Sequence, residues 1–119
     1  MVKNMSKEKI ENKIIDEKEI ATLIGDVASQ TYGVVGLTRA KTLKNQLIIL
    51  KRDNYVGGVL VSKNSKNKYE IDVHLIVAFG VKITEVVNEV SKRISYETKK
   101  KYGDIFYKIN VYVEDLLDL

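Results

Sequence analysis

Apolar and polar residues alternate from Tyr69 to Phe79, which is the pattern of a β-strand with one buried face. From Ile83 the apolar spacing changes to four, three and four, which predicts an amphipathic helix over residues 83–101, with Ile83, Val87, Val90 and Ile94 on its buried stripe. Period two then returns in Tyr107, Ile109, Val111 and Val113. The stretch therefore predicts a β-α-β unit whose second strand runs parallel to the first, through a right-handed crossover.

An earlier helix is predicted over residues 17–31. Asp16 is placed to cap its first turn, and Glu19, three residues later, completes the pattern of a capping box. The helix has one apolar stripe, formed by Ile20, Leu23, Ile24, Val27 and Ala28. Gly25 lies inside this helix at a cost of about 1 kcal/mol relative to alanine, so we expect a neighbour to pack closely against it.

Val59 and Val61 alternate with their neighbours, and a polar turn at residues 64–67 leads from them into the Tyr69 strand. Such a pair of strands forms an antiparallel hairpin. Together with the crossover, the hairpin predicts an α+β fold: a small mixed three-stranded sheet with both helices on one face.

The chain of 119 residues has the length of one domain, expected over residues 15–119, with a flexible tail at residues 1–14.

Residues 37–56 allow two interpretations. Leu43, Leu47 and Leu50 have helical spacing and favour a short helix, but the apolar run at residues 47–50 is equally typical of a buried strand.

The sequence contains no cysteine, which removes disulfides and thiolate metal sites and is typical of a reducing compartment. The first residues lack the apolar core of a signal peptide, and no run of about 18 apolar residues occurs. We therefore expect a cytoplasmic protein.

The net charge of +4 comes mostly from lysines scattered along the chain. Scattered lysines attract nucleic acid more weakly than the clustered basic stripe of a dedicated nucleic-acid binder.

The sheet face away from the helices carries the candidate chemistry. The period of two places on it Asp72, His74, Ile76 and Ala78 from the first long strand and Lys108, Asn110, Tyr112 and Glu114 from the last. His74 and Asp72 share this face, as a base and an orienting carboxylate do, but no serine or cysteine nucleophile is spaced to join them. One histidine among scattered carboxylates also predicts no metal site. Ile76, Ala78 and Tyr112 add apolar and aromatic groups to this face, and such a mixture is typical of a contact surface.

The stretch from Gly33 to Gly36 spells GxxG, the sequence with which a KH domain clamps a nucleic-acid backbone. Valines between the glycines offer phosphate no charge, so a helix-terminating bend is the preferred interpretation. The alternative is a nucleic-acid-binding module that uses this bend together with nearby basic residues, namely Lys41, Lys44, Lys51 and Arg52.

Several segments together resemble the alkaline shock protein family of Gram-positive bacteria and their relatives, which is associated with cell-envelope stress. These segments are residues 20–25, 32–36, 55–59, 71–83 and 110–113, so the resemblance extends over nearly the whole chain. Thr84 stands where members often have proline, and both residues suit a first helical turn.

The resemblance implies a non-enzymatic protein, without cofactor or metal, that self-associates or docks on a membrane-anchored partner at the cytoplasmic side. The sequence adds a candidate contact surface, and we expect it to include Val34, Val35, Ile76 and Tyr112.

Overall fold

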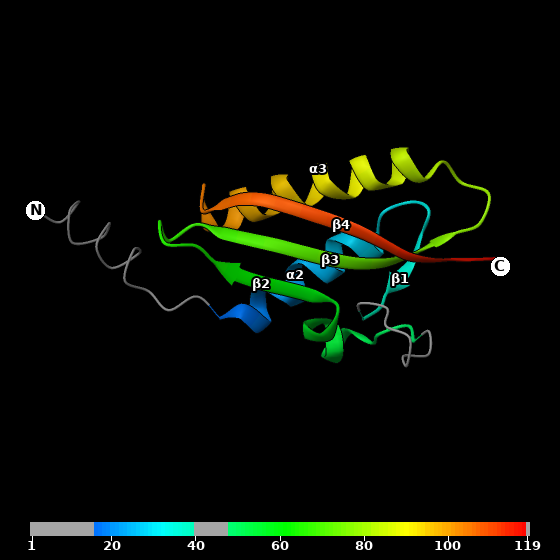
Figure 1. Ribbon diagram of the computed structural model, residues 1–119, viewed down its shortest axis with the longest axis horizontal. Coiled ribbons are helices and arrows are strands. Elements are labelled where there is room, and N and C mark those ends of the chain that lie inside the picture. The colour runs from blue at the N-terminus through cyan, green and yellow to red at the C-terminus, as the bar shows by residue number, and fades with distance from the viewer. Residues whose placement is uncertain (1–15, 40–47, 119) are drawn as a thin grey trace, which may run out of the picture.

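A computed structural model describes residues 16–39 and 48–118. The predicted tail at residues 1–14 lies outside the described residues, as do Lys41, Leu43, Lys44 and Leu47. The described elements are, in chain order, α2 (Glu17–Ser29), β1 (Val34–Leu37), the 3-10 helix η1 (Arg52–Gly57), β2 (Val59–Lys63), β3 (Tyr69–Ala78), α3 (Ile83–Tyr102) and β4 (Phe106–Leu117). The fold is α+β, as expected from the sequence (Figure 1).

The sheet has four strands, so the predicted count of three is wrong. β3 lies in the middle, and β4 pairs with one of its edges in parallel. The other edge is shared, since β2 pairs antiparallel with residues 69–73 of β3 and β1 pairs antiparallel with residues 75–77. The extra strand, β1, is the stretch that the sequence suggested to be a bend. The right-handed sense of the crossover stays a prediction.

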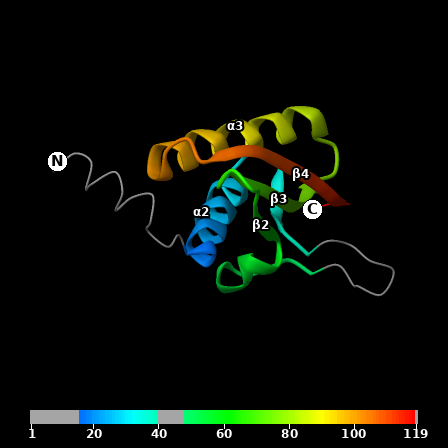
Figure 2. The same cartoon turned by 60° about the vertical axis from the view of Figure 1, so that its left-hand side comes forward.

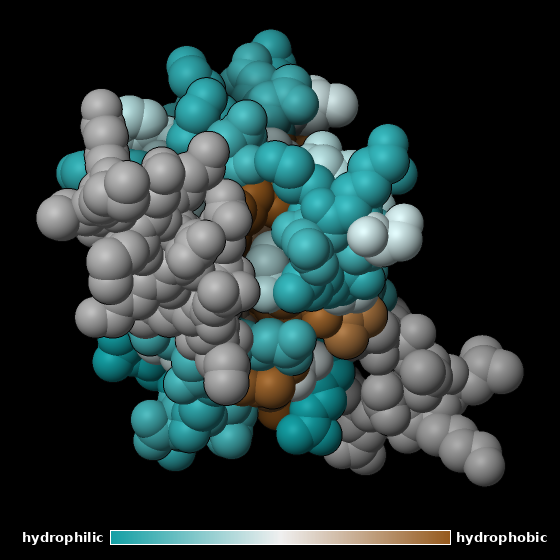
Figure 3. Space-filling model, turned by 90° about the vertical axis from the view of Figure 1, so that its left-hand side faces the viewer, coloured by the Kyte–Doolittle hydropathy of each residue, from teal (hydrophilic) through white to brown (hydrophobic). Residues whose placement is uncertain are grey.

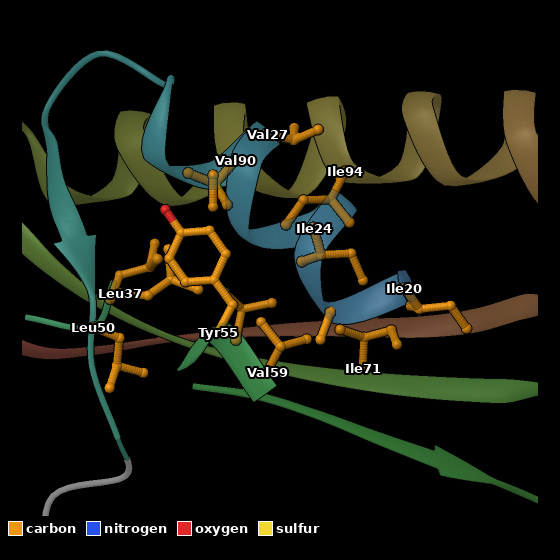
Figure 4. Packing of buried hydrophobic residues seen from close by; sticks show 14 of the residues in the cluster. Ile20, Ile24, Val27, Leu37, Leu50, Tyr55, Val59, Ile71, Val90 and Ile94 are labelled. Carbon is orange, nitrogen blue, oxygen red and sulfur yellow. The ribbon is translucent and has the colours of Figure 1, made fainter. Parts of the chain in front are cut away.

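Both helices lie on one side of the sheet. Figure 1 shows α2 crossing behind β3 and α3 running alongside β4, and the turned view in Figure 2 agrees. Alternate residues of β3 face the helices, and Ile71, Val73, Leu75 and Val77 are fully buried there. They meet Ile20 and Ile24 from α2 and Val90 and Ile94 from α3 (Figure 4). Each such side chain contributes roughly 1.5–3 kcal/mol through burial, so this layer holds the fold together.

The buried stripe of α3 differs from the predicted one at its start. The helix buries Val86, Val90, Ile94 and Thr98, whereas Ile83 is exposed and Val87 is only partly buried. Thr98 fits this apolar face because its hydroxyl donates a hydrogen bond to the carbonyl of Ile94. Phe79, expected on the buried face of the first long strand, is 66% exposed because β3 ends one residue before it.

The predicted Asp16 cap of α2 is observed, and Glu19 from the same turn also contacts α3. Asp16 caps α2 by accepting a hydrogen bond from the amide of Lys18. Glu19 reaches the far end of α3, where it forms an ion pair with Lys101 and accepts a hydrogen bond from the Tyr102 hydroxyl. The start of α2 is thereby tied to the end of α3.

Candidate functional site

The sheet face opposite the helices is called here the open face. Its described residues come from three strands: Leu60 from β2, Glu70, Asp72 and His74 from β3, and Lys108, Asn110, Tyr112 and Glu114 from β4. The parallel register places Asn110 beside Asp72 and Tyr112 beside His74. The period-two pattern thus predicted most of this face correctly.

His74 pairs with a different carboxylate from the one that the sequence suggested. Its Nδ1 lies 2.6 Å from Oε2 of Glu114, and both side chains are largely buried. Asp72 instead accepts a hydrogen bond from the Asn110 side-chain amide at 2.8 Å. The His74–Asp72 dyad of a general base is therefore not formed.

The imidazole of His74 also supports Tyr112. The two rings stack with their centroids 5.1 Å apart and their planes 16° apart. Tyr112 is 45% exposed. An exposed aromatic ring held against a buried pair loses little conformational freedom when another surface covers it.

A second polar cluster is centred on Glu70. Its carboxylate accepts hydrogen bonds from the Tyr107 hydroxyl at 2.6 Å and from the Asn110 amide at 2.7 Å. The bond from Tyr107, supported by Asn110, lowers the pKa of Glu70, and the same bond raises the pKa of Tyr107.

Tyr107 was expected on the buried face with Ile109 and Val111. The register between β3 and β4 shifts at this point, so that Tyr69 pairs with Phe106 and Glu70 with Lys108. Tyr107 is the extra residue of this bulge, and its hydroxyl reaches Glu70 on the open face. An alternating pattern contains no signal for such a shift.

The structure separates the four predicted contact residues. Tyr112 is exposed on the open face, but Ile76 is fully buried and cannot contact a partner in this state. Gly36 pairs with Ile76, and Cγ2 of Ile49 lies 2.8 Å from the place of a Cβ on Gly36, so a segment after β1 covers this part of the sheet. Val34 packs against the core, and Val35 is partly buried at a break in the register of β1.

The GxxG stretch does not form a clamp between two helices. Gly33 ends the turn after α2, and the next residues form β1, whose backbone is paired with β3. Of the basic residues in the nucleic-acid alternative, Arg52 forms a two-point ion pair with Asp26, with contacts of 2.9 Å, 3.1 Å and 2.9 Å. This stretch therefore does not form the loop between two helices on which the KH-like interpretation depended.

Within residues 16–39 and 48–118, no three histidine, cysteine or acidic side chains are grouped as metal ligands. No helix in this part of the chain is both long and apolar enough to span a membrane.

Lys99 and Lys100 are exposed at the end of α3, and Figure 3 shows mainly hydrophilic side chains on that end of the molecule.

The family model of alkaline shock protein 23, described as having a cell envelope-related function, matches residues 5–117. The chain belongs to this family. The match includes every described strand and helix, so the open face lies within the family domain. The family resemblance seen in the sequence is confirmed.

Two relatives are similar over most of their length. One is the uncharacterized protein Spy1614 of Streptococcus pyogenes serotype M6, 30% identical over 103 residues, which are 86% of this chain and 84% of the relative. The other is the uncharacterized protein YloU of Bacillus subtilis, 32% identical over 101 residues, which are 84% of this chain and 83% of the relative. No solved structure matches the chain.

Proposed function

We propose that this protein is a non-enzymatic interaction module of the cell envelope that uses its open face to bind other protein surfaces. The partners are copies of the protein itself or a membrane-anchored protein reached from the cytoplasmic side. The family's envelope-related function supports the setting. The proposal itself rests on the make-up of the open face.

One observation carries the proposal: exposed aromatic and apolar groups stand on a face whose carboxylates, histidine and asparagine are already hydrogen-bonded. On this face Tyr112 is 45% exposed and Leu60 60%, and Tyr107, the bulge residue whose hydroxyl reaches Glu70, is 51% exposed. Interfaces are enriched in tyrosine, and their energy is concentrated in a few well-supported anchors. Tyr112, stacked on His74, is the best-supported anchor on this face.

The arrangement of His74 favours binding over catalysis. Its Nδ1 is engaged by Glu114 at 2.6 Å, and one side of its ring is covered by Tyr112. The histidine thus holds the exposed ring of Tyr112 in position, as expected of a residue that supports a contact residue.

The test combines Tyr112→Ala with Leu60→Ser and measures self-association by sedimentation. We expect the variant to associate at least roughly tenfold more weakly, because central aromatic anchors dominate interfaces. Tyr96→Ala is the matched control, since Tyr96 is an exposed tyrosine on α3, in the helix layer. Unchanged association of a variant with a native circular dichroism spectrum would show that the open face is not the contact surface.

Docking on a membrane-anchored partner has its own readout. We expect the protein to sediment with membranes from its own cells, and the Tyr112→Ala, Leu60→Ser variant to remain in the supernatant. Equal membrane association of variant and wild-type protein would contradict docking through the open face.

A further inference from the structure

Lysines that are scattered along the sequence gather at one end of the folded molecule. They come from two places, the turn of the β2–β3 hairpin and the last turn of α3. Both places lie at the end of the sheet where β3 and β4 begin, on the left of Figure 1 and towards the viewer in Figure 3. This group is called here the basic end, and its members are Lys63, Lys66, Lys68, Lys99 and Lys100.

The two lysine-bearing segments are held together by direct contacts. Nζ of Lys68 donates a hydrogen bond to the backbone carbonyl of Asp104, in the loop between α3 and β4. The rings of Tyr69 and Phe106 have centroids 5.7 Å apart, and Phe106 also meets Tyr102, from the end of α3, at 6.0 Å. The fold therefore fixes the position of one segment relative to the other.

Nearby acidic groups do not cancel the charge of the basic end. Lys101 pairs with Glu19 at 2.9 Å, and for this reason we do not count it as a member. Glu97 and Asp104 also lie close by, but they are fewer than the lysines of the basic end. Positive charges held together repel one another, so contact with an anionic surface stabilises this arrangement.

The opposite end of the molecule has the opposite charge. Glu85 and Glu89 are exposed in the first two turns of α3, and Asp118 is exposed after β4. Lys82 also lies at this end, 3.8 Å from Glu85. In front of a negatively charged plane, such a molecule is attracted at one end and repelled at the other. This charge separation, which is independent of the lysine cluster, suits an extended anionic surface better than a small anion.

An exposed aromatic ring stands beside the basic end. Tyr96 precedes Lys100 by one turn of α3 and is 64% exposed, and Nζ of Lys100 lies 6.0 Å from its ring centroid. Tyrosine is enriched where water meets lipid headgroups, because its ring is apolar while its hydroxyl stays hydrated. Lysines beside an exposed tyrosine are thus suited to a headgroup layer.

We propose that the basic end binds the anionic headgroups of a lipid bilayer directly. Lysine ammonium groups attract phosphate headgroups as point charges, without a fixed contact geometry. Nucleic acid, another large anion, fits less well. Its specific contacts favour the planar, two-point geometry of arginine, whereas the basic end consists of lysine alone. The envelope-related function of the family also favours lipid.

This inference rests on the proposed envelope setting and adds a direct lipid contact to the docking on a membrane-anchored partner. One weak membrane signal gives only marginal, reversible binding, and stable attachment takes two. The basic end supplies one signal and the open face supplies the other. Loss of the open face is therefore enough to release the protein from cell membranes, although the basic end is intact.

The test uses vesicles that contain no protein, made either of phosphatidylcholine alone or of phosphatidylcholine and phosphatidylglycerol in equal parts. We expect the full chain to sediment with the anionic vesicles at low salt and to stay in the supernatant with the neutral ones. Salt at about 0.5 M should release it, because exposed charges are then screened within a few ångströms. Equal binding to both kinds of vesicle, or binding that salt does not weaken, would overturn the proposal.

Two pairs of substitutions locate the contact. Lys66→Gln with Lys100→Gln should weaken binding to the anionic vesicles by roughly tenfold or more, since each lysine near the surface adds to the attraction. Lys51→Gln with Lys82→Gln removes the same charge from exposed positions outside the basic end and should weaken binding far less. Equal losses from the two pairs, in variants with native circular dichroism spectra, would mean that net charge alone is responsible and that the basic end is not the site.

Two further samples separate this proposal from the others. The Tyr112→Ala, Leu60→Ser variant should bind the anionic vesicles like the wild-type protein, so failure of the open face and failure of the basic end are distinguished. The mixed oligonucleotide pool replaces the vesicles in the second sample. A protein that ignores the vesicles but binds the pool, and loses this binding with Lys66→Gln and Lys100→Gln, would assign the basic end to nucleic acid instead of lipid.

Discussion

Gly25 lies in the middle of α2, where the ring of Tyr55 from η1 crosses the helix (Figure 4). A Cβ at this position would overlap with the ring. The sequence predicted that a neighbour packs closely here, because a glycine inside a helix otherwise costs stability. It did not identify Tyr55, since the intervening segment has no readable periodicity.

Replacing Gly25 by alanine should therefore destabilise the protein by about 1–3 kcal/mol, as overpacked cores do, despite the better helix propensity of alanine. The free energy of unfolding in urea measures this change. In a Tyr55→Ala background the overlap is gone, so the same Gly25→Ala substitution should become neutral or stabilising. Destabilisation of equal size in both backgrounds would contradict the assigned contact.

Glu70 and Tyr107 form a contact whose strength depends on pH. The hydrogen bond from Tyr107 is the first cause of the lowered pKa of Glu70. A lowered pKa means that the folded state favours the ionised carboxylate. This stabilisation is present above the ordinary pKa of a glutamate and is lost as the pH falls through the lowered value.

Tyr107→Phe should raise the pKa of Glu70 towards its ordinary value, while the bond from Asn110 keeps part of the shift. An NMR titration of the Glu70 side chain follows the change, with Tyr96→Phe as the control. If the pKa of Glu70 is the same in Tyr107→Phe and in the wild-type protein, the bulge at Tyr107 is misplaced.

At the scale of the elements, periodicity predicted α2, α3, β2, β3 and β4 but not β1. A four-residue strand that follows Gly33 and contains Gly36 is too short to show an alternation, and its place in the sheet depends on pairing with the distant end of β3. The predicted buried stripe of α3 was wrong at its start because it too depends on contacts with distant parts of the chain. The helix is polar over much of its surface, and which face is buried is decided by its contacts with α2 and the sheet.

Ile94 tests the observed stripe of α3. It is fully buried in the core, so Ile94→Ala should cost about 2–5 kcal/mol in the free energy of unfolding. Tyr96→Ala removes a larger but exposed side chain from the same helix and should change stability by less than about 0.5 kcal/mol. Comparable losses from the two substitutions would mean that α3 presents another face to the sheet.

The whole molecule has two layers, with helices on one side of the sheet and the open face on the other (Figures 1 and 2). The sequence predicted this layering and most residues of the open face, because a period of two fixes which side chains share a face. The pairing of His74 with Glu114, 40 residues away, could not be predicted, since it depends on a register shift between Val113 and Asp115. The burial of Ile76 was missed because it depends on how the segment after β1 covers the sheet.

We propose that this family member works by binding protein surfaces, its own copies included. Light scattering of the purified protein at two concentrations, without and with a pool of mixed oligonucleotides, tests it most directly. We expect a molar mass that rises with protein concentration and is unaffected by the oligonucleotides. A monomer at both concentrations, whose mass rises only when nucleic acid is added, would contradict it.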